Sequence, residues 1–167
     1  MPDGEVRASL GVPVTRKETA MTTMEGTVHA IRGRRALADI AVSEAMHRGV
    51  LTCPPSAPLI EVARMMARQR VHCLVVCDNG CEPGTGVWAV LSDLDLIAAA
   101  GVRPAEEQTA EGSAASPVVQ VAPTDSLEHA AQLMTEYASA HLVVVDPGTQ
   151  HPVGVLSTLD IARAIAR

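Results

Sequence analysis

The sequence is almost without aromatic residues. Its 167 residues include no Phe, one Trp (Trp88) and one Tyr (Tyr137). It also lacks an excess of positive charge, because 13 basic and 19 acidic residues give a net charge of −6. Nucleic-acid-binding domains usually carry a basic surface, so these two features argue against general nucleic-acid binding. The hydrophobic core must instead be built from Val, Leu, Ile, Ala and Met.

Long apolar runs are missing as well. Every apolar run is far shorter than the roughly 20 residues that a membrane-spanning helix needs. Residues 1–20 contain acidic side chains and no apolar block, unlike a secretory signal peptide. We therefore expect a cytoplasmic protein that does not contact a membrane. Four cysteines in a cytoplasmic chain do not indicate a disulfide framework.

Hydrophobic residues still make up 47% of the chain, enough for the core of one domain. Residues 1–35 show no sustained hydrophobic period, and we interpret them as a flexible segment. The basic cluster of Arg32, Arg34 and Arg35 at its end is interpreted as a solvated linker. The alternative is an arm that contacts a phosphate or a partner.

An internal repeat occupies the rest of the chain. Leu59 aligns with Leu127, which sets the offset between the repeated positions (127 − 59 = 68). The same offset pairs Ala63 with Ala131, Met66 with Met134, and residues 74–76 with residues 142–144. After the Gly- and Pro-rich loop at residues 79–86, the offset falls to 65 (157 − 92 = 65). We name residues 36–101 copy one and residues 102–167 copy two.

Both copies predict the element order β-α-β-β-α. In copy one, the predicted strands are residues 49–52, 73–77 and 88–92, and the predicted helices are one from Leu59 and residues 94–100. In copy two, the predicted strands are residues 117–121, 142–145 and 153–157, and the predicted helices are one from Leu127 and residues 159–166. Apolar residues recur at i, i+3, i+4 and i+7 from Leu59 and from Leu127, which is typical of an amphipathic helix. Residues 36–47 predict one leading helix, and residues 102–115 a partly helical bridge. The fold class is α+β.

Each copy contains a Ser-x-x-Asp run where a strand passes into a helix, at Ser92 and Asp95 and at Ser157 and Asp160. We expect the Ser at the helix N-cap and the Asp at the third helical position. Free N–H groups at a helix N-terminus favour an anion, and a carboxylate there suits ribose hydroxyls. The alternative interpretation is a capping box without a ligand.

These features together resemble the cystathionine-β-synthase (CBS) domain family. The resemblance covers residues 42–167 and depends on the paired repeat, the run His-Leu-Val-Val-Val-Asp at residues 141–146 and the run Val-Gly-Val-Leu-Ser-Thr-Leu-Asp at residues 153–160. It implies two copies packed through their sheets as a pseudo-two-fold pair. It also implies clefts between the copies that hold adenosine nucleotides, and modules that associate in pairs.

Carrying the family pattern over gives one candidate ligand site in each copy. The site of copy two would comprise Ser157, Thr158, Asp160, Val118, Val119, Ala140 and His141. The site of copy one would comprise Ser92, Asp95, Val50, Leu51, Thr52 and His72. Copy one departs from the pattern, since Ala89 stands where copy two has Gly154, and Asp93 adds a negative charge near the expected phosphate. Both departures favour copy two.

The resemblance implies a non-catalytic regulatory module that binds AMP, ADP, ATP or S-adenosylmethionine and requires no cofactor. It also implies a homodimer and a partner protein that the module regulates. The alternative is an interaction module with empty clefts. An enzyme is disfavoured, because the sequence shows no nucleophile–base pair, metal cage or Gly-rich phosphate loop.

The cysteines favour no metal site. Residues four apart on one strand lie about 13 Å apart, from a rise of about 3.3 Å per residue. Cys73 and Cys77 could therefore not share a zinc ion on a regular strand, and we interpret both as core residues. Cys81 is interpreted as a loop thiol, with the alternative that it is reactive.

Overall fold

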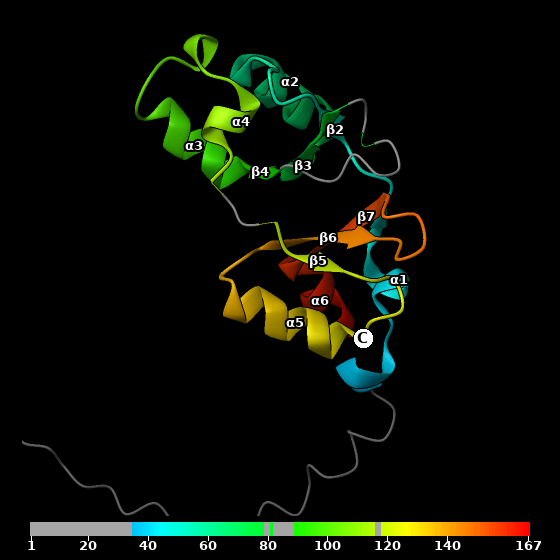
Figure 1. Ribbon diagram of the computed structural model, residues 1–167. Helices are drawn as coiled ribbons and strands as arrows, with labels where there is room; N and C mark the ends of the chain where they lie inside the picture. The colour runs from blue at the N-terminus through cyan, green and yellow to red at the C-terminus, as the bar shows by residue number, and fades with distance from the viewer. Residues whose placement is uncertain (1–34, 79–80, 82–88, 116–117) are drawn as a thin grey trace, which may run out of the picture. The chain divides into compact units, whose positions relative to one another are not determined.

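A computed structural model describes residues 35–78, 81, 89–115 and 118–167 (Figure 1). The predicted flexible segment at residues 1–35 lies outside the described residues except for Arg35, and so do Arg32 and Arg34. Most of the loop that carries the length difference between the copies also lies outside them. Within the described residues the fold is α+β, as predicted, and each copy follows the predicted element order.

Copy one forms a sheet of three strands among the described residues, in the order β2-β3-β4. Its elements are β2 (Thr52–Cys53), α2 (Leu59–Gln69), β3 (Cys73–Val76), β4 (Ala89–Ser92) and α3 (Asp93–Ala100). Strands β2 and β3 run parallel, and β4 returns antiparallel to β3. Helix α2 buries Leu59, Val62 and Met66, which confirms the predicted apolar face.

Copy two repeats this arrangement. Its elements are β5 (Gln120–Val121), α5 (Leu127–Glu136), β6 (His141–Val145), β7 (Pro152–Ser157) and α6 (Thr158–Ile165). The strand order is β1-β7-β6-β5, with β5 parallel to β6 and β7 antiparallel to β6. Helix α5 buries Leu127, Ala130 and Met134, the counterparts of the buried face of α2.

The predicted leading helix at residues 36–47 is wrong as a single element. The segment divides into the 3₁₀ helix η2 (Leu37–Asp39), the four-residue α1 (Val42–Ala45) and the strand β1 (His47–Arg48). Strand β1 joins the sheet of copy two by pairing with β7, with Arg48 opposite Gly154. A Cβ atom at position 154 would collide with the carbonyl oxygen of His47. Only glycine therefore allows this close approach.

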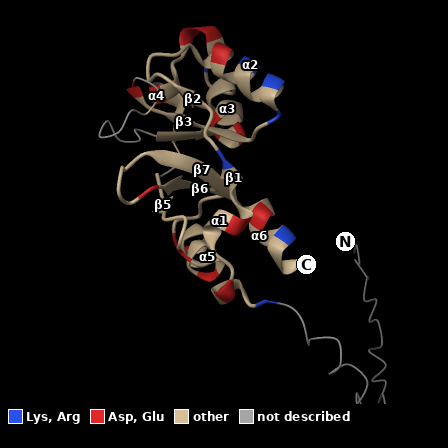
Figure 2. Cartoon of the chain, turned by 90° about the vertical axis from the view of Figure 1, so that its right-hand side faces the viewer, with Lys and Arg blue, Asp and Glu red and all other residues tan. Residues whose placement is uncertain are grey.

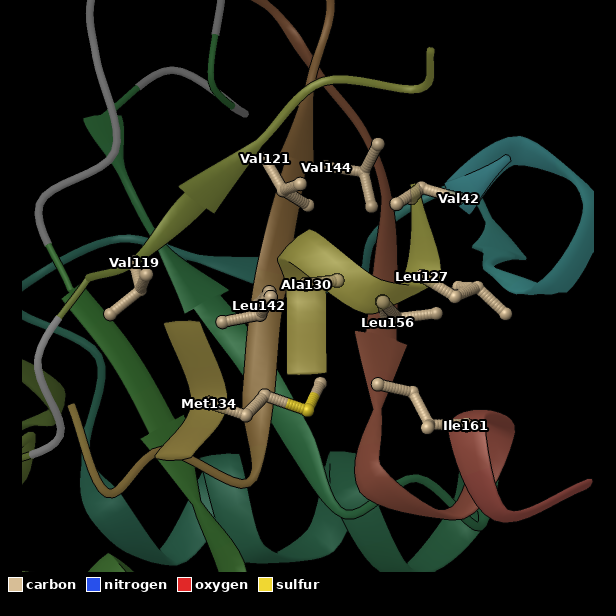
Figure 3. Close-up of a cluster of buried hydrophobic side chains, with 10 residues drawn as sticks. All are labelled: Val42, Val119, Val121, Leu127, Ala130, Met134, Leu142, Val144, Leu156 and Ile161. Atoms are coloured by element: carbon tan, nitrogen blue, oxygen red, sulfur yellow. The ribbon is translucent and has the colours of Figure 1, made fainter. Parts of the chain in front are cut away.

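The leading segments of the two copies are exchanged. In copy one the segment includes α1, whose Val42 is fully buried in the core of copy two with Leu127, Leu156 and Ile161 (Figure 3). In copy two it includes η4 (Ala105–Glu107) and α4 (Ala110–Ser113), whose Ala110 is buried in the core of copy one. Figure 1 accordingly shows α4 beside α2 and α1 near α5 and α6. The division of the sequence between residues 101 and 102 stays a prediction.

Backbone hydrogen bonds hold both exchanged segments by the same pattern. The N–H groups of Val42, Ser43 and Leu127 donate to the carbonyl oxygens of Asp125, Pro123 and Ile40, at 2.8, 3.0 and 2.8 Å. The N–H groups of Ala110, Glu111 and Leu59 donate to the carbonyl oxygens of Ala57, Pro55 and Gln108, at 2.9, 3.0 and 2.9 Å. Each bond has its counterpart at the offset that relates the two copies, so the repeat seen in the sequence is also a repeat of hydrogen bonds.

A third hydrophobic cluster lies between the two sheets. It contains Cys73, Val75, Cys77, Cys81 and Val90 of copy one with Val143 and Val145 of copy two. The alternating residues of the same strands, such as Leu74 and Leu142, point into the core of their own copy. Both faces of β3 and β6 are therefore buried, which explains why these strands are continuously apolar.

The interpretation of Cys77 and Cys81 as separate thiols is wrong, because the two form a disulfide bond. A turn after β3 brings their Cα atoms to 5.2 Å, within the range that a disulfide spans. Asn79-Gly80 between them was a turn signal that could have predicted this approach. Cys53 and Cys73 are free and buried.

Candidate functional site

The corner between β7 and α6 has the predicted geometry. Ser157 is the N-cap of α6, and its Oγ accepts a hydrogen bond from the backbone N–H of Asp160 at 3.3 Å. In return, Oδ2 of Asp160 accepts from the backbone N–H and the Oγ of Ser157, at 2.9 and 2.6 Å. The Asp160 side chain is only 3% exposed. The Ser-x-x-Asp run of copy two is thus a reciprocal cap that also buries a carboxylate.

Two further side chains contact the other oxygen of this carboxylate. Nη1 of Arg163 lies 3.1 Å, and Nε2 of His47 lies 3.2 Å, from Oδ1 of Asp160. Arg163 is one helical turn further along α6, whereas His47 comes from β1 and reaches the site only because β1 pairs with β7. Figure 2 shows β1 beside β7, and α6 below them with a basic position. Sequence reasoning missed both residues, although the three-residue spacing of Asp160 and Arg163 is a signal for a helical ion pair.

The Asp160 carboxylate has about four lone-pair positions that can accept hydrogen bonds. The four protein contacts occupy these positions. The two contacts from Ser157 are internal to the cap. The other two come from exposed side chains, since His47 is 70% and Arg163 is 56% exposed. A hydroxyl-bearing ligand at this corner would therefore bind Oδ1 in place of His47 or Arg163.

The corner between β4 and α3 of copy one has the same cap. Oδ2 of Asp95 accepts from the backbone N–H and the Oγ of Ser92, both at 2.7 Å, and Asp95 N–H donates to Ser92 Oγ at 3.2 Å. Its cationic surroundings differ. Alanines at positions 98 and 115 are the counterparts of Arg163 (163 − 65 = 98) and His47 (47 + 68 = 115), the two residues that contact Asp160.

Copy one also has an ion pair of its own beside the corner. Nδ1 of His72 lies 2.9 Å from Oδ2 of Asp93, the residue that follows the N-cap. The corresponding residues of copy two are Ala140 and Thr158. A histidine and a carboxylate in copy one thus replace a methyl group and a hydroxyl group in copy two.

The other predicted residues lie at two distances from the corners. The strand-entry residues contact them directly, because the N–H of Thr158 donates to Ala140 O at 3.0 Å and the N–H of Asp93 donates to His72 O at 2.9 Å. His141 lies opposite Ser157 in the sheet register.

The first-strand residues reach the corners only through the central strands. In copy two, Val119 O accepts from Val143 N–H, and in copy one, Leu51 O accepts from Val75 N–H and Thr52 lies opposite Val75. Val50 and Val118 pack against the cluster between the sheets.

His141 is half-buried at the entry of β6. Burial lowers the pKa of its imidazole, while the carboxylate of Asp93 in copy one acts in the opposite direction. The charges of His72, Asp160 and Asp95 also act on His141. Ionisable groups from both copies therefore lie within electrostatic range of this side chain.

In the part of the chain that the structure describes, no group of three or more His, Cys, Asp or Glu side chains is placed to hold a metal ion. None of the helices described is long and apolar enough to cross a membrane. A surface groove beside α5, lined by Leu37, Ala131, Thr135 and neighbouring residues, contains none of the predicted site residues.

A family model for the CBS domain matches residues 42–101 and 114–167. The chain belongs to the CBS domain family. The two matches fall in the two copies, and the structure agrees with those of known CBS domain pairs. The pair of protein MJ0100, solved with 5′-methylthioadenosine and S-adenosyl-L-methionine, has a TM-score of 0.66 and 19% identity, covering 76% of this chain and 96% of that one.

Two other proteins are similar to this chain. CBSX2, solved with AMP, has a TM-score of 0.60 and 24% identity, covering 75% of this chain and 96% of that one. The identities of both solved structures are low enough that they show the fold alone. The uncharacterized protein MJ0450 of Methanocaldococcus jannaschii is 29% identical over 106 residues, which are 62% of this chain and 54% of that protein. This CBS chain thus spans about half the length of that relative.

Proposed function

We propose that this CBS domain pair is a non-catalytic regulatory module that binds an adenosine nucleotide at the β7–α6 corner of copy two. The observation that carries the proposal is the buried Asp160 carboxylate, with one oxygen fixed by Ser157 and the other contacted by two exposed basic side chains. Complexes of MJ0100 and CBSX2 with adenosine compounds support the ligand class. AMP, ADP, ATP and S-adenosylmethionine are the candidates.

Binding would begin with the ribose. Its hydroxyls donate to Oδ1 of Asp160 and displace His47 and Arg163, while Ser157 keeps Oδ2 in place. The N-terminus of α6, where Thr158 is exposed, provides a positive dipole end for an anionic group. The adenine contacts Val118 and Val119 and the strand entry at Ala140 and His141. Release of His47 changes the contacts of β1, so the ligand is linked to the exchanged leading segment.

The corner of copy one is the weaker candidate. Ser92, Asp95, Val50, Leu51, Thr52 and His72 provide similar backbone positions. Asp93 adds a negative charge at the start of α3, where it pairs with His72, and the alanines at positions 98 and 115 provide no further cation. Repulsion between like charges therefore disfavours a phosphate there.

A matched pair of variants tests the proposal. Asp160→Ala and Asp95→Ala each remove the carboxylate of an equivalent cap, and loss of a cap costs about 1 kcal/mol. We expect wild type and Asp95→Ala to gain several degrees in Tm with one of the four ligands. A ligand at 100 times its Kd adds about 2.7 kcal/mol of stability. Asp160→Ala should lose this gain. Equal gains in all three proteins would refute the site, and no gain in wild type would refute the ligand class.

A ligand-free interaction module remains the second candidate, and one observation favours it. Leu94 and Ile97 on α3 are each 69% exposed, and Leu159 at the equivalent position of α6 is 52% exposed. We propose that these side chains form the interface between two protein molecules in a homodimer, or contact a regulated partner protein. Light scattering after size exclusion should show a dimer that Leu94→Glu/Ile97→Glu converts to a monomer. A monomeric wild type would contradict self-association.

A further inference from the structure

The disulfide between Cys77 and Cys81 belongs to the cluster between the two sheets. Both cysteines are 1% exposed and pack in the same group as Val143 and Val145 of copy two. Cys81 adopts a left-handed conformation with φ of 61°, which is uncommon outside glycine. The bond therefore holds Cys81 in a strained conformation at the surface that copy one presents to copy two.

We propose that Cys77 and Cys81 form a reversible disulfide that responds to low-molecular-weight disulfides and controls the packing between the two copies. In the reducing reaction, two external thiols deliver two electrons and two protons, the S–S bond breaks, and one external disulfide forms. In the oxidising reaction, an external disulfide takes the two electrons, the Cys77–Cys81 bond forms, and two external thiols leave.

The place of Cys81 in the structure makes the packing depend on the bond. Its backbone N–H donates to Asp78 O at 2.9 Å, and its side chain is bonded to Cys77. Cys77 is anchored independently, because its N–H donates to Cys53 O at 3.0 Å at the end of β3. Reduction thus leaves Cys77 in place but frees Cys81 to leave a strained conformation. Its departure would open the cluster on the side of β6.

The other two cysteines do not compete for this reaction. Cys53 and Cys73 are buried, and burial raises the pKa of the Cys53 thiol to about 11 and that of the Cys73 thiol to about 12. Thiolates are the reactive form, so both groups stay protonated at neutral pH. In the cytoplasm, the compartment that we propose, disulfides are usually transient or redox-sensing. A reversible bond at Cys77–Cys81 agrees with that environment.

Hydrogen–deuterium exchange tests the coupling between the copies. The protein is oxidised with glutathione disulfide or reduced with dithiothreitol, and amide exchange is measured in β6 (His141–Val145), a strand without cysteine. We expect reduction to speed exchange in β6 and to lower Tm by roughly 4–8 °C, the shift that closure of so short a loop implies. Cys77→Ala/Cys81→Ala should behave like reduced wild type under both conditions. The control Cys53→Ala/Cys73→Ala should keep the wild-type response.

Three outcomes would overturn the proposal. The first is oxidised protein whose four thiols all react under denaturing conditions without a reductant, since no bond then exists. The second is faster exchange confined to residues around 78–81, which would show that the bond stabilises only the segment that it closes. The third outcome applies if the double variant does not fold, in which case wild type is titrated with glutathione mixtures. Amide exchange in β6 that does not follow the fraction of reduced protein would then refute the coupling.

Discussion

The two copies share the cap of Ser-x-x-Asp but differ in what surrounds it. In both, the Asp carboxylate accepts from the backbone N–H and the hydroxyl of its Ser. Only Asp160 also contacts Arg163 and His47. The cap is what the fold needs in both copies, because it starts a helix at the end of a buried strand. The difference in sequence is that the positions equivalent to Arg163 and His47 are alanines in copy one.

The two sheets also differ at one position of their last strands. Gly154 pairs with Val144 of β6 and lets β1 lie against β7, whereas the equivalent Ala89 (154 − 65 = 89), which pairs with Val76 of β3, carries a Cβ atom. The glycine thus allows β1 to pair with β7, and this pairing brings His47 to Asp160. Sheet architecture and the electrostatics of the corner are linked at one position.

The largest effect should come from giving each of these two positions the amino acid of the other, in two separate variants. Gly154→Ala places a methyl group against the carbonyl of His47, and we expect a loss of about 2–3 kcal/mol in the free energy of unfolding. Ala89→Gly should cost about 1 kcal/mol or less. Urea denaturation of both variants measures the difference. Equal losses would show that the approach of β1 does not depend on the glycine.

A smaller effect concerns His141, which stands where copy one has Cys73 (141 − 68 = 73). Burial lowers the pKa of His141 in the folded state, so the unfolded chain takes up a proton first as the pH falls. Stability that is present at neutral pH is therefore lost below the ordinary histidine pKa of about 6.5. We expect His141→Cys to lose less stability between pH 7.5 and pH 5.5 than wild type. An identical loss in both proteins would assign the acid sensitivity to other groups.

The smallest effect should come from the leading segments, where Glu44 of copy one corresponds to Gly112 of copy two. Oε2 of Glu44 pairs with Nη1 of Arg35 at 2.7 Å, and Oε1 accepts from Ala41 N–H at 3.0 Å. The hydrogen bond with Arg35 is the main cause that lowers the pKa of Glu44 to about 2, from a usual value of 4.5. The contribution is thus complete above pH 4.5 and lost as the pH falls toward 2.

Glu44→Gln measures this contribution. Wild type should be slightly more stable than the variant at pH 5.5, and the two should converge as the pH falls to about 2. Because the pair is exposed, 0.5 M salt should reduce the difference at pH 5.5. A difference that persists at low pH would mean that Glu44 acts through packing.

Sequence analysis could predict the parts of the fold that are local or repeated. The apolar spacing from Leu59 and Leu127, the continuously apolar strands and the Ser caps each depend on nearby residues, and all are confirmed. Helix α2 begins at Leu59, as predicted, although its N-cap Pro58 provides no side-chain cap. The constant offset between the copies also showed which positions are equivalent.

The rest depended on contacts between distant segments. An offset shows that Val42 corresponds to Ala110, but not that each packs in the other copy. Likewise, nothing near Asp160 in the sequence indicates His47, which arrives through the pairing of β1 with β7. The disulfide was not predicted, because four cysteines in a chain expected to be cytoplasmic do not indicate disulfides. The ligand roles of the site residues stay predictions.

The exchange of leading segments has a consequence for the origin of the chain. A polypeptide with one copy would expose the surface that Val42 or Ala110 now covers, and could cover it only with the leading segment of another such polypeptide. An ancestor with one copy would then have been an obligate pair of subunits that traded their amino-terminal arms. Duplication and fusion would have turned that assembly into one chain, leaving each half free to acquire its own substitutions.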